Sequence, residues 1–123
     1  MSALSTGIDL IEIERLQRAI DRHGMHFLER VFTAQELTEV AGNTASLAAR
    51  FAAKEAVTKA LGTGIGQVTW HEIEILRQPD CAPELRLHGA AGRLSEDLGL
   101  ETWSISLSHT QTHAIAMVVA MGR

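Results

Sequence analysis

Three separated segments of the chain carry side chains whose types and spacing could perform chemistry. The first segment ends at Asp9, and the second, from Arg50 to Gly62, contains Glu55 and Lys59. The third is the run Ser106-Leu107-Ser108-His109. Carboxylates, amines and imidazoles can transfer protons or bind phosphate groups. These segments are therefore the candidates for a functional site.

The charged residues of the first two segments also have purely structural interpretations. Asp9 precedes a segment of helical periodicity, so it could cap that helix, because Asp is favoured at helix N-termini. Glu55 and Lys59 are four residues apart, and an exposed ion pair at this spacing stabilises a helix by about 0.3–0.5 kcal/mol. The sequence leaves both interpretations open.

The sequence around the histidines and glycines does not match two common motifs, the zinc protease motif and the phosphate-binding glycine loop. His109 and His113 lack the helical setting and the Glu partner of the zinc protease motif, so a zinc site is not expected. Gly62-Thr63-Gly64 follows a helix instead of preceding one, and the chain contains no Gly-Lys-Ser/Thr. It therefore matches neither a P-loop nor a dinucleotide fingerprint.

Length and composition predict one domain, residues 1–123, of an ordinary globular kind. The chain has 123 residues, 46% of them hydrophobic, and a formal net charge of -4. Nucleic-acid binders usually carry an excess of Lys and Arg, so we expect no nucleic-acid partner. Met1 to Leu10 lacks the features of a signal peptide, and no apolar run approaches membrane length. The single cysteine, Cys81, is expected in a turn, and a cytoplasmic location without membrane contact fits best.

The first half of the chain is expected to be mainly helical. A short strand should end at Asp9, at a strand-to-helix junction, because apolar residues then recur at helical spacing. Thr33 and Glu36 form a capping-box signature, so a short helix should begin after Thr33. The run from Ala45 to Leu61 has no Gly or Pro and predicts the longest helix, ended by Gly62.

The second half is expected to be mainly antiparallel. Alternating residues and turn signals predict strands at Val68–Leu76, Leu85–Leu87, Trp103–Ser108 and Ala114–Ala120, and a helix at Ala90–Leu98. The first of these strands should be half-buried, and the third should carry a serine face. The last two should form a hairpin whose turn region holds His109 and His113. Met117 and Met121 are most simply core or edge residues of the last strand.

Taken together, these segments resemble the holo-acyl-carrier-protein synthase family of phosphopantetheinyl transferases. Gly7-Ile8-Asp9-Leu10, with Arg15 downstream, is similar to the family's N-terminal motif. The run from Arg50 to Gly64 resembles its signature helix, and Ser106–His109 its C-terminal motif. Between the second and third predicted strands the chain departs from the family, with Gln78–Pro83 in place of a Gly-Lys-Pro-like turn.

The resemblance implies transfer of 4'-phosphopantetheine from coenzyme A to a serine of apo acyl carrier protein, in support of fatty acid biosynthesis. It implies a magnesium ion (Mg²⁺) held by Asp9 and Glu55, while Ile11 stands where larger relatives have a second acidic residue. Glu55, directly or through water, is the candidate for accepting the serine proton, and Lys59 for stabilising the leaving phosphate. The predicted catalytic set is thus Asp9, Glu55 and Lys59. The residues expected to bind coenzyme A are Arg50, Lys59, Gly62, Gly64, Ser108 and His109.

The resemblance also implies an acidic protein partner and a homotrimer. Arg15, Arg18 and Arg22 form one stripe on the first helix, which we expect to contact the carrier protein. For Arg18 and Arg22 a simple solvated helix face is an equal alternative. The expected fold is α+β, a small, mainly antiparallel sheet with a long helix packed on it, assembled as a trimer with active sites between subunits.

Two other functions remain possible at this stage. A trimeric sensor of coenzyme A or another nucleotide could use the same glycines and His109, but it would not need metal-binding carboxylates. A metal-dependent phosphohydrolase would release free phosphopantetheine without a protein acceptor. Addition of phosphopantetheine to a carrier protein distinguishes the transferase from both.

Overall fold

The longest helix, α4 (Thr44–Leu61), forms the centre of the molecule. The computed structural model describes residues 3–77 and 82–122. The Asn43 side chain caps the N-terminus of α4 by accepting a hydrogen bond from the Ser46 backbone N–H at 3.0 Å. Gly62, in the left-handed region with φ 73°, ends the helix. The helix predicted at Ala45–Leu61 is thereby confirmed.

A three-stranded antiparallel sheet lies against one side of α4. Its strands are β1 (Leu4–Glu12), β5 (His113–Met121) and β4 (Thr102–His109), with β5 in the middle. Along β5 buried residues alternate with more accessible ones. The buried residues, which form the inner face of the strand, are Ala114, Ala116, Val118 and Ala120. Because most of these side chains are a single methyl group, the helix can lie close to the sheet.

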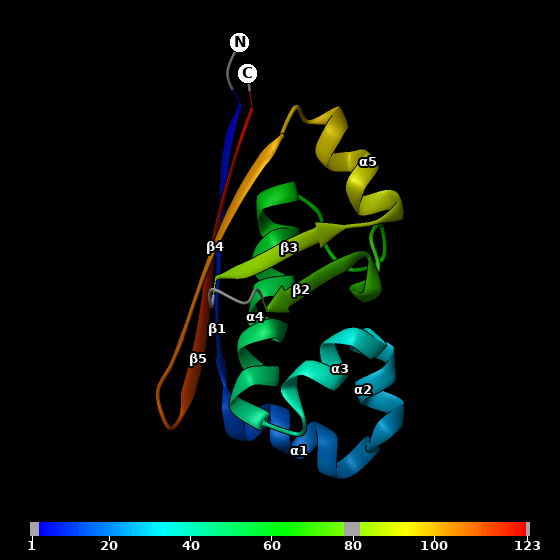
Figure 1. Cartoon of the computed structure of the whole chain (residues 1–123), viewed down its shortest axis with the longest axis vertical. Helices are drawn as coiled ribbons and strands as arrows, with labels where there is room; N and C mark the ends of the chain where they lie inside the picture. Colours follow the sequence, from blue (N-terminus) through cyan, green and yellow to red (C-terminus); the bar gives the residue numbers. More distant parts are fainter. Residues whose placement is uncertain (1–2, 78–81, 123) are drawn as a thin grey trace.

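The remaining elements cover the same side of this sheet. The chain order after β1 is α1 (Ile13–His23), α2 (Met25–Val31), α3 (Ala34–Val40), α4, a short 3-10 turn η1 (Trp70–Glu72), the hairpin β2 (Ile73–Arg77) and β3 (Pro83–Leu87), and α5 (Gly89–Asp97). In Figure 1 every helix and the hairpin lie on one side of the sheet formed by β1, β5 and β4. The opposite face of this sheet is left without cover from the chain's own described elements.

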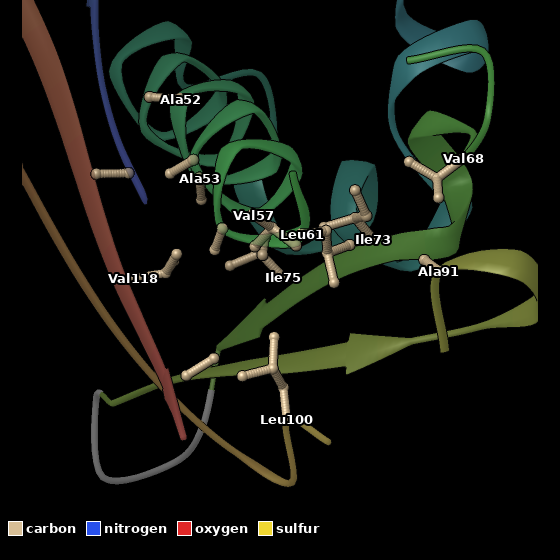
Figure 2. Close-up of a cluster of buried hydrophobic side chains, with 14 residues drawn as sticks. Ala52, Ala53, Val57, Leu61, Val68, Ile73, Ile75, Ala91, Leu100 and Val118 are labelled. Atoms are coloured by element: carbon tan, nitrogen blue, oxygen red, sulfur yellow. The ribbon is translucent and has the colours of Figure 1, made fainter. Parts of the chain in front are cut away.

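The hydrophobic core lies between α4 and its two neighbours, the sheet and the β2–β3 hairpin. Figure 2 shows Val57 and Leu61 of α4 pointing towards Ile73 and Ile75 of β2, with Val118 of β5 on the other side. Val57, Ile73 and Val118 are fully buried. Burial of this kind, worth roughly 25 cal/mol per Å² of apolar surface, is the main force that fixes α4 in place.

The strand β1 comes close to the backbone of α4 at Gly7. A Cβ atom at this position would lie 1.8 Å from the carbonyl oxygen of Ala56. Two residues earlier on the strand, the Ser5 hydroxyl donates a hydrogen bond to the Ala60 carbonyl oxygen at 2.6 Å. Only glycine permits the contact at position 7, so it fixes the position of β1 along the helix.

A buried ion pair ties the other side of α4 to α3 and β2. The Lys54 ammonium donates hydrogen bonds to Glu36 at 2.8 Å and to the Trp70 carbonyl oxygen at 3.0 Å, and both charged side chains are fully buried. Glu36 also accepts a hydrogen bond from the backbone N–H of Ile75 at 2.9 Å. Burial lowers the pKa of Lys54, while the charge of Glu36 opposes that shift. Removing either partner would leave a buried charge without compensation.

Most predicted elements are confirmed, with shifted ends. The capping box at Thr33 and Glu36 is present and begins α3. The helix predicted at Ala90–Leu98 is α5, and the predicted strands near the C-terminus are β4 and β5, with the serines of β4 exposed. The predicted turn at Gln78–Pro83, with Cys81, falls largely on residues 78–81, outside the described residues.

Three expectations are wrong. The strand predicted at Val68–Leu76 begins only at Ile73, and its first four residues are buried, so it is not half-buried. His109 ends β4 and His113 begins β5, so the two histidines flank the turn instead of lying in it. Met117 and Met121 are 47% and 52% exposed on the central strand, so they are neither core nor edge residues.

Within the described residues, no helix is long and apolar enough to cross a membrane.

We expect Gly7→Ala to destabilise the fold by about 1–3 kcal/mol, because the added methyl group must displace the α4 backbone. Urea denaturation gives the free energy of unfolding. Gly64→Ala is the matched control, since a Cβ there meets nothing within 4 Å, and it should be close to neutral. Equal stability of the two variants would contradict the close contact at Gly7.

Candidate active site

A pocket of about 530 Å³ lies beside β1, between α1, α2 and α4. This volume is within the usual range for small-molecule sites. Asp9 and Glu55 both line it, although 46 positions separate them in the sequence. The fold therefore brings together the two carboxylates that the sequence analysis selected.

Asp9 lies within β1 and not at a strand-to-helix junction. The strand continues to Glu12, which is the N-cap residue of α1 and forms no side-chain capping bond. Asp9 pairs with Ala116 of β5 in the strand register. The expected junction is therefore wrong, and helix capping is excluded as the role of Asp9.

Lys59 pairs with Asp9 instead of with Glu55. Its ammonium donates hydrogen bonds to Asp9 Oδ1 at 3.1 Å and to the Ile8 carbonyl oxygen at 2.8 Å. Among the described ion pairs there is none between Lys59 and Glu55, so the simple pair along the helix is not formed. The Lys59 side chain is 53% exposed, which leaves its ammonium accessible to a ligand.

The electrostatics of the pocket favour a cation. Burial raises the pKa of Glu55, the charge of Asp9 raises it further, and the charge of Lys59 opposes both. Two carboxylates that repel each other at the edge of a pocket are a donor set suited to Mg²⁺, which commonly takes one or two protein carboxylates. The described residues contain no group of three or more metal-binding side chains, so water and substrate would have to complete the coordination.

The residues expected to bind coenzyme A fall into two groups. Arg50, Ser108 and His109 line a second pocket of about 320 Å³ beside β4. Arg50 is buried there and pairs with Glu39 at 2.9 Å. Gly62 and Gly64 follow the far end of α4, and Gly62 is about 18 Å along the helix from Arg50 at 1.5 Å per residue. One chain does not bring the two groups together.

The predicted basic stripe is present on α1. Arg15, Arg18 and Arg22 line a hollow of about 330 Å³ on the surface of the helix, whereas Leu16 on the opposite side is buried. Arg15 also lines the pocket that contains Asp9 and Glu55. The stripe is therefore continuous with the carboxylate pocket.

Sequence reasoning missed several residues of the carboxylate pocket. Glu12 and His113 line it, and they face each other in the register of β1 and β5. Phe27 and Phe51 supply an aromatic wall. The short distance in sequence between Asp9 and Glu12 is a weak indication that both lie near one site. Nothing in the sequence around His113, Phe27 or Phe51 indicates that they share a cavity with Asp9.

Comparisons with known proteins identify the family. The family model of the 4'-phosphopantetheinyl transferase superfamily matches residues 5–118. The holo-[acyl-carrier-protein] synthase of Herpetosiphon aurantiacus is 49% identical over 97% of this chain and 99% of its own. That of Moorella thermoacetica is 49% identical over 96% of this chain and 92% of its own.

Solved structures show the same fold. The Helicobacter pylori holo-[acyl-carrier-protein] synthase in complex with coenzyme A superposes with a TM-score of 0.85 at 34% identity, covering 94% of this chain and 98% of that one. The Neisseria meningitidis synthase superposes with a TM-score of 0.86 at 36% identity, covering 94% of this chain and 96% of that one.

We expect Asp9→Asn to lower the pKa of Glu55 in the cation-free protein, though not to its ordinary value, because burial is the larger cause of the shift. Carbon-13 NMR of the labelled Glu55 carboxyl group, followed as a function of pH, measures this pKa. Because the pKa of Glu55 is raised in the folded chain, the folded state holds more protons than the unfolded state between the unfolded and the folded pKa. The free energy of unfolding should therefore fall as pH rises through this range. The fall should be smaller in Asp9→Asn. Asp21→Asn, on the exposed face of α1, is the control, and an unchanged Glu55 pKa in Asp9→Asn would contradict the proximity of the two carboxylates.

Proposed function

Because the chain belongs to the holo-[acyl-carrier-protein] synthase family of phosphopantetheinyl transferases, we propose that it moves 4'-phosphopantetheine from coenzyme A to a serine of apo acyl carrier protein, in a Mg²⁺-dependent reaction that supports fatty acid biosynthesis. The products are holo acyl carrier protein and adenosine 3',5'-bisphosphate. The observation that carries the proposal is that Asp9 and Glu55 line one pocket, with the Lys59 ammonium paired to Asp9 beside it.

The residues of the pocket fit the needs of phosphoryl transfer. Bound Mg²⁺ would neutralise the charge of the pyrophosphate, and Asp9 and Glu55 are the residues to hold it. Lys59 would stabilise the negative charge that develops on the leaving phosphate. The raised pKa of Glu55 suits it to accept the serine proton, directly or through water.

Binding of coenzyme A is proposed to use two subunits. Gly62 and Gly64 would approach the phosphates near Lys59, whereas Arg50, Ser108 and His109 line the separate pocket beside β4. A neighbouring chain that presents its Ser108 and His109 to this chain's Gly62 would unite the two groups. The separation of the two groups within one chain is what supports the proposed homotrimer.

The first test is mass spectrometry of an apo carrier protein incubated with the protein, coenzyme A and Mg²⁺. We expect a mass gain of one phosphopantetheine, and a loss of at least about 100-fold in rate for Asp9→Ala and Glu55→Ala, because an electrostatic group at the reacting centre is worth that much. Circular dichroism checks that the variants fold. A folded variant that transfers at the wild-type rate would remove that residue from the metal site.

The second test concerns the carrier protein, which we propose docks on Arg15, Arg18 and Arg22. Arg15→Glu should raise the KM for carrier protein far more than the KM for coenzyme A, because charge reversal repels an acidic partner. Steady-state kinetics with each substrate varied in turn measures both constants. An equal effect on both constants would remove Arg15 from the docking surface.

The third test concerns the uncovered face of the sheet, where Leu4, Ile8, Leu10, Met117 and Met121 are exposed. We propose that it is the trimer interface, so Met117→Glu should dissociate the assembly and abolish activity, because burying an unpaired charge is costly. Light scattering and the transfer assay on the same samples measure both. Leu98→Glu, at an apolar residue 44% exposed at the end of α5, is the control. A fully active Met117→Glu monomer would show that one chain suffices.

A further inference from the structure

Lys59 forms an ion pair with Asp9, one of the two carboxylates proposed to bind the metal ion. Its ammonium lies 3.1 Å from Asp9 Oδ1 and 2.8 Å from the Ile8 carbonyl oxygen. The sequence contains only two lysines, and the other, Lys54, is fully buried in its pair with Glu36. Lys59 is therefore the one lysine whose amine can exchange partners at the surface.

A cation at Asp9 would compete with the Lys59 ammonium for this carboxylate. Both carry positive charge, and both would bind the same carboxylate, so their close approach is repulsive. The ion pair is largely exposed on the lysine side and therefore weak, so it can open readily. A new anionic partner within reach would stabilise the open position.

We propose that Lys59 couples the binding of the metal ion to the binding of the coenzyme. In the free protein it holds Asp9, and when the coenzyme's phosphates arrive it moves to them and releases Asp9 for the cation. This inference rests on the proposed function, because it requires both ligands at the same pocket. Each ligand then strengthens binding of the other, and the coupling is equal in both directions.

The test measures Mn²⁺ affinity by electron paramagnetic resonance of the free ion, with and without saturating adenosine 3',5'-bisphosphate. Lys59→Met should bind Mn²⁺ about ten-fold tighter than the wild type without nucleotide, and the gain from adding nucleotide should fall by the same factor. Arg15→Gln is the control, because it removes a positive charge from the same pocket without freeing Asp9. Circular dichroism confirms that each variant folds.

The outcomes separate this inference from the proposed function. An affinity gain of equal size with and without nucleotide, or one that Arg15→Gln reproduces, would show a general charge effect and overturn the coupling. If the wild type modifies the carrier protein but Lys59→Met shows no gain, the coupling alone fails. If the wild type neither binds Mn²⁺ nor modifies the carrier, the proposed function fails with it.

Discussion

The contact between Gly7 and the backbone of Ala56 is the constraint on which the site depends. It places β1 against α4 more closely than any residue with a side chain would permit. Asp9 follows two residues after Gly7 on the strand, and Glu55 and Lys59 lie on either side of Ala56 along the helix. Backbone packing therefore sets how far apart the chain holds these three residues, and within that spacing the exposed Lys59 side chain can exchange partners.

The opposite face of α4 is held by polar contacts instead of by close backbone packing. Lys54, the residue before Glu55, is fully buried and bonded to Glu36, which in turn binds the backbone of β2. Because these partners fix the rotation of the helix about its own axis, Glu55 must face the pocket. The rigidity that a metal site needs thus comes from both faces of one helix.

The sequence predicted local features well and distant partners poorly. The α4 helix, the capping box at Thr33 and the strands β4 and β5 follow from spacing that a single segment contains. The partner of Lys59 could not be predicted in this way, because the i,i+4 rule favours Glu55, while β1 brings Asp9 closer. The burial of Glu74 depends likewise on Thr33 and His88, which belong to other parts of the chain.

The uncovered sheet face and the divided coenzyme residues lead to the same proposal by independent routes. On that face Ser106 is paired with Met117 and Ser108 with Ile115, so the serine column and the exposed apolar residues form one surface. A neighbour that covers Met117 of β5 would therefore lie next to Ser106 of β4, the strand that ends at His109. Covering apolar surface favours assembly, and assembly would bring the second group of coenzyme-binding residues to the first. In this proposal a single apolar face both holds the subunits together and completes the site.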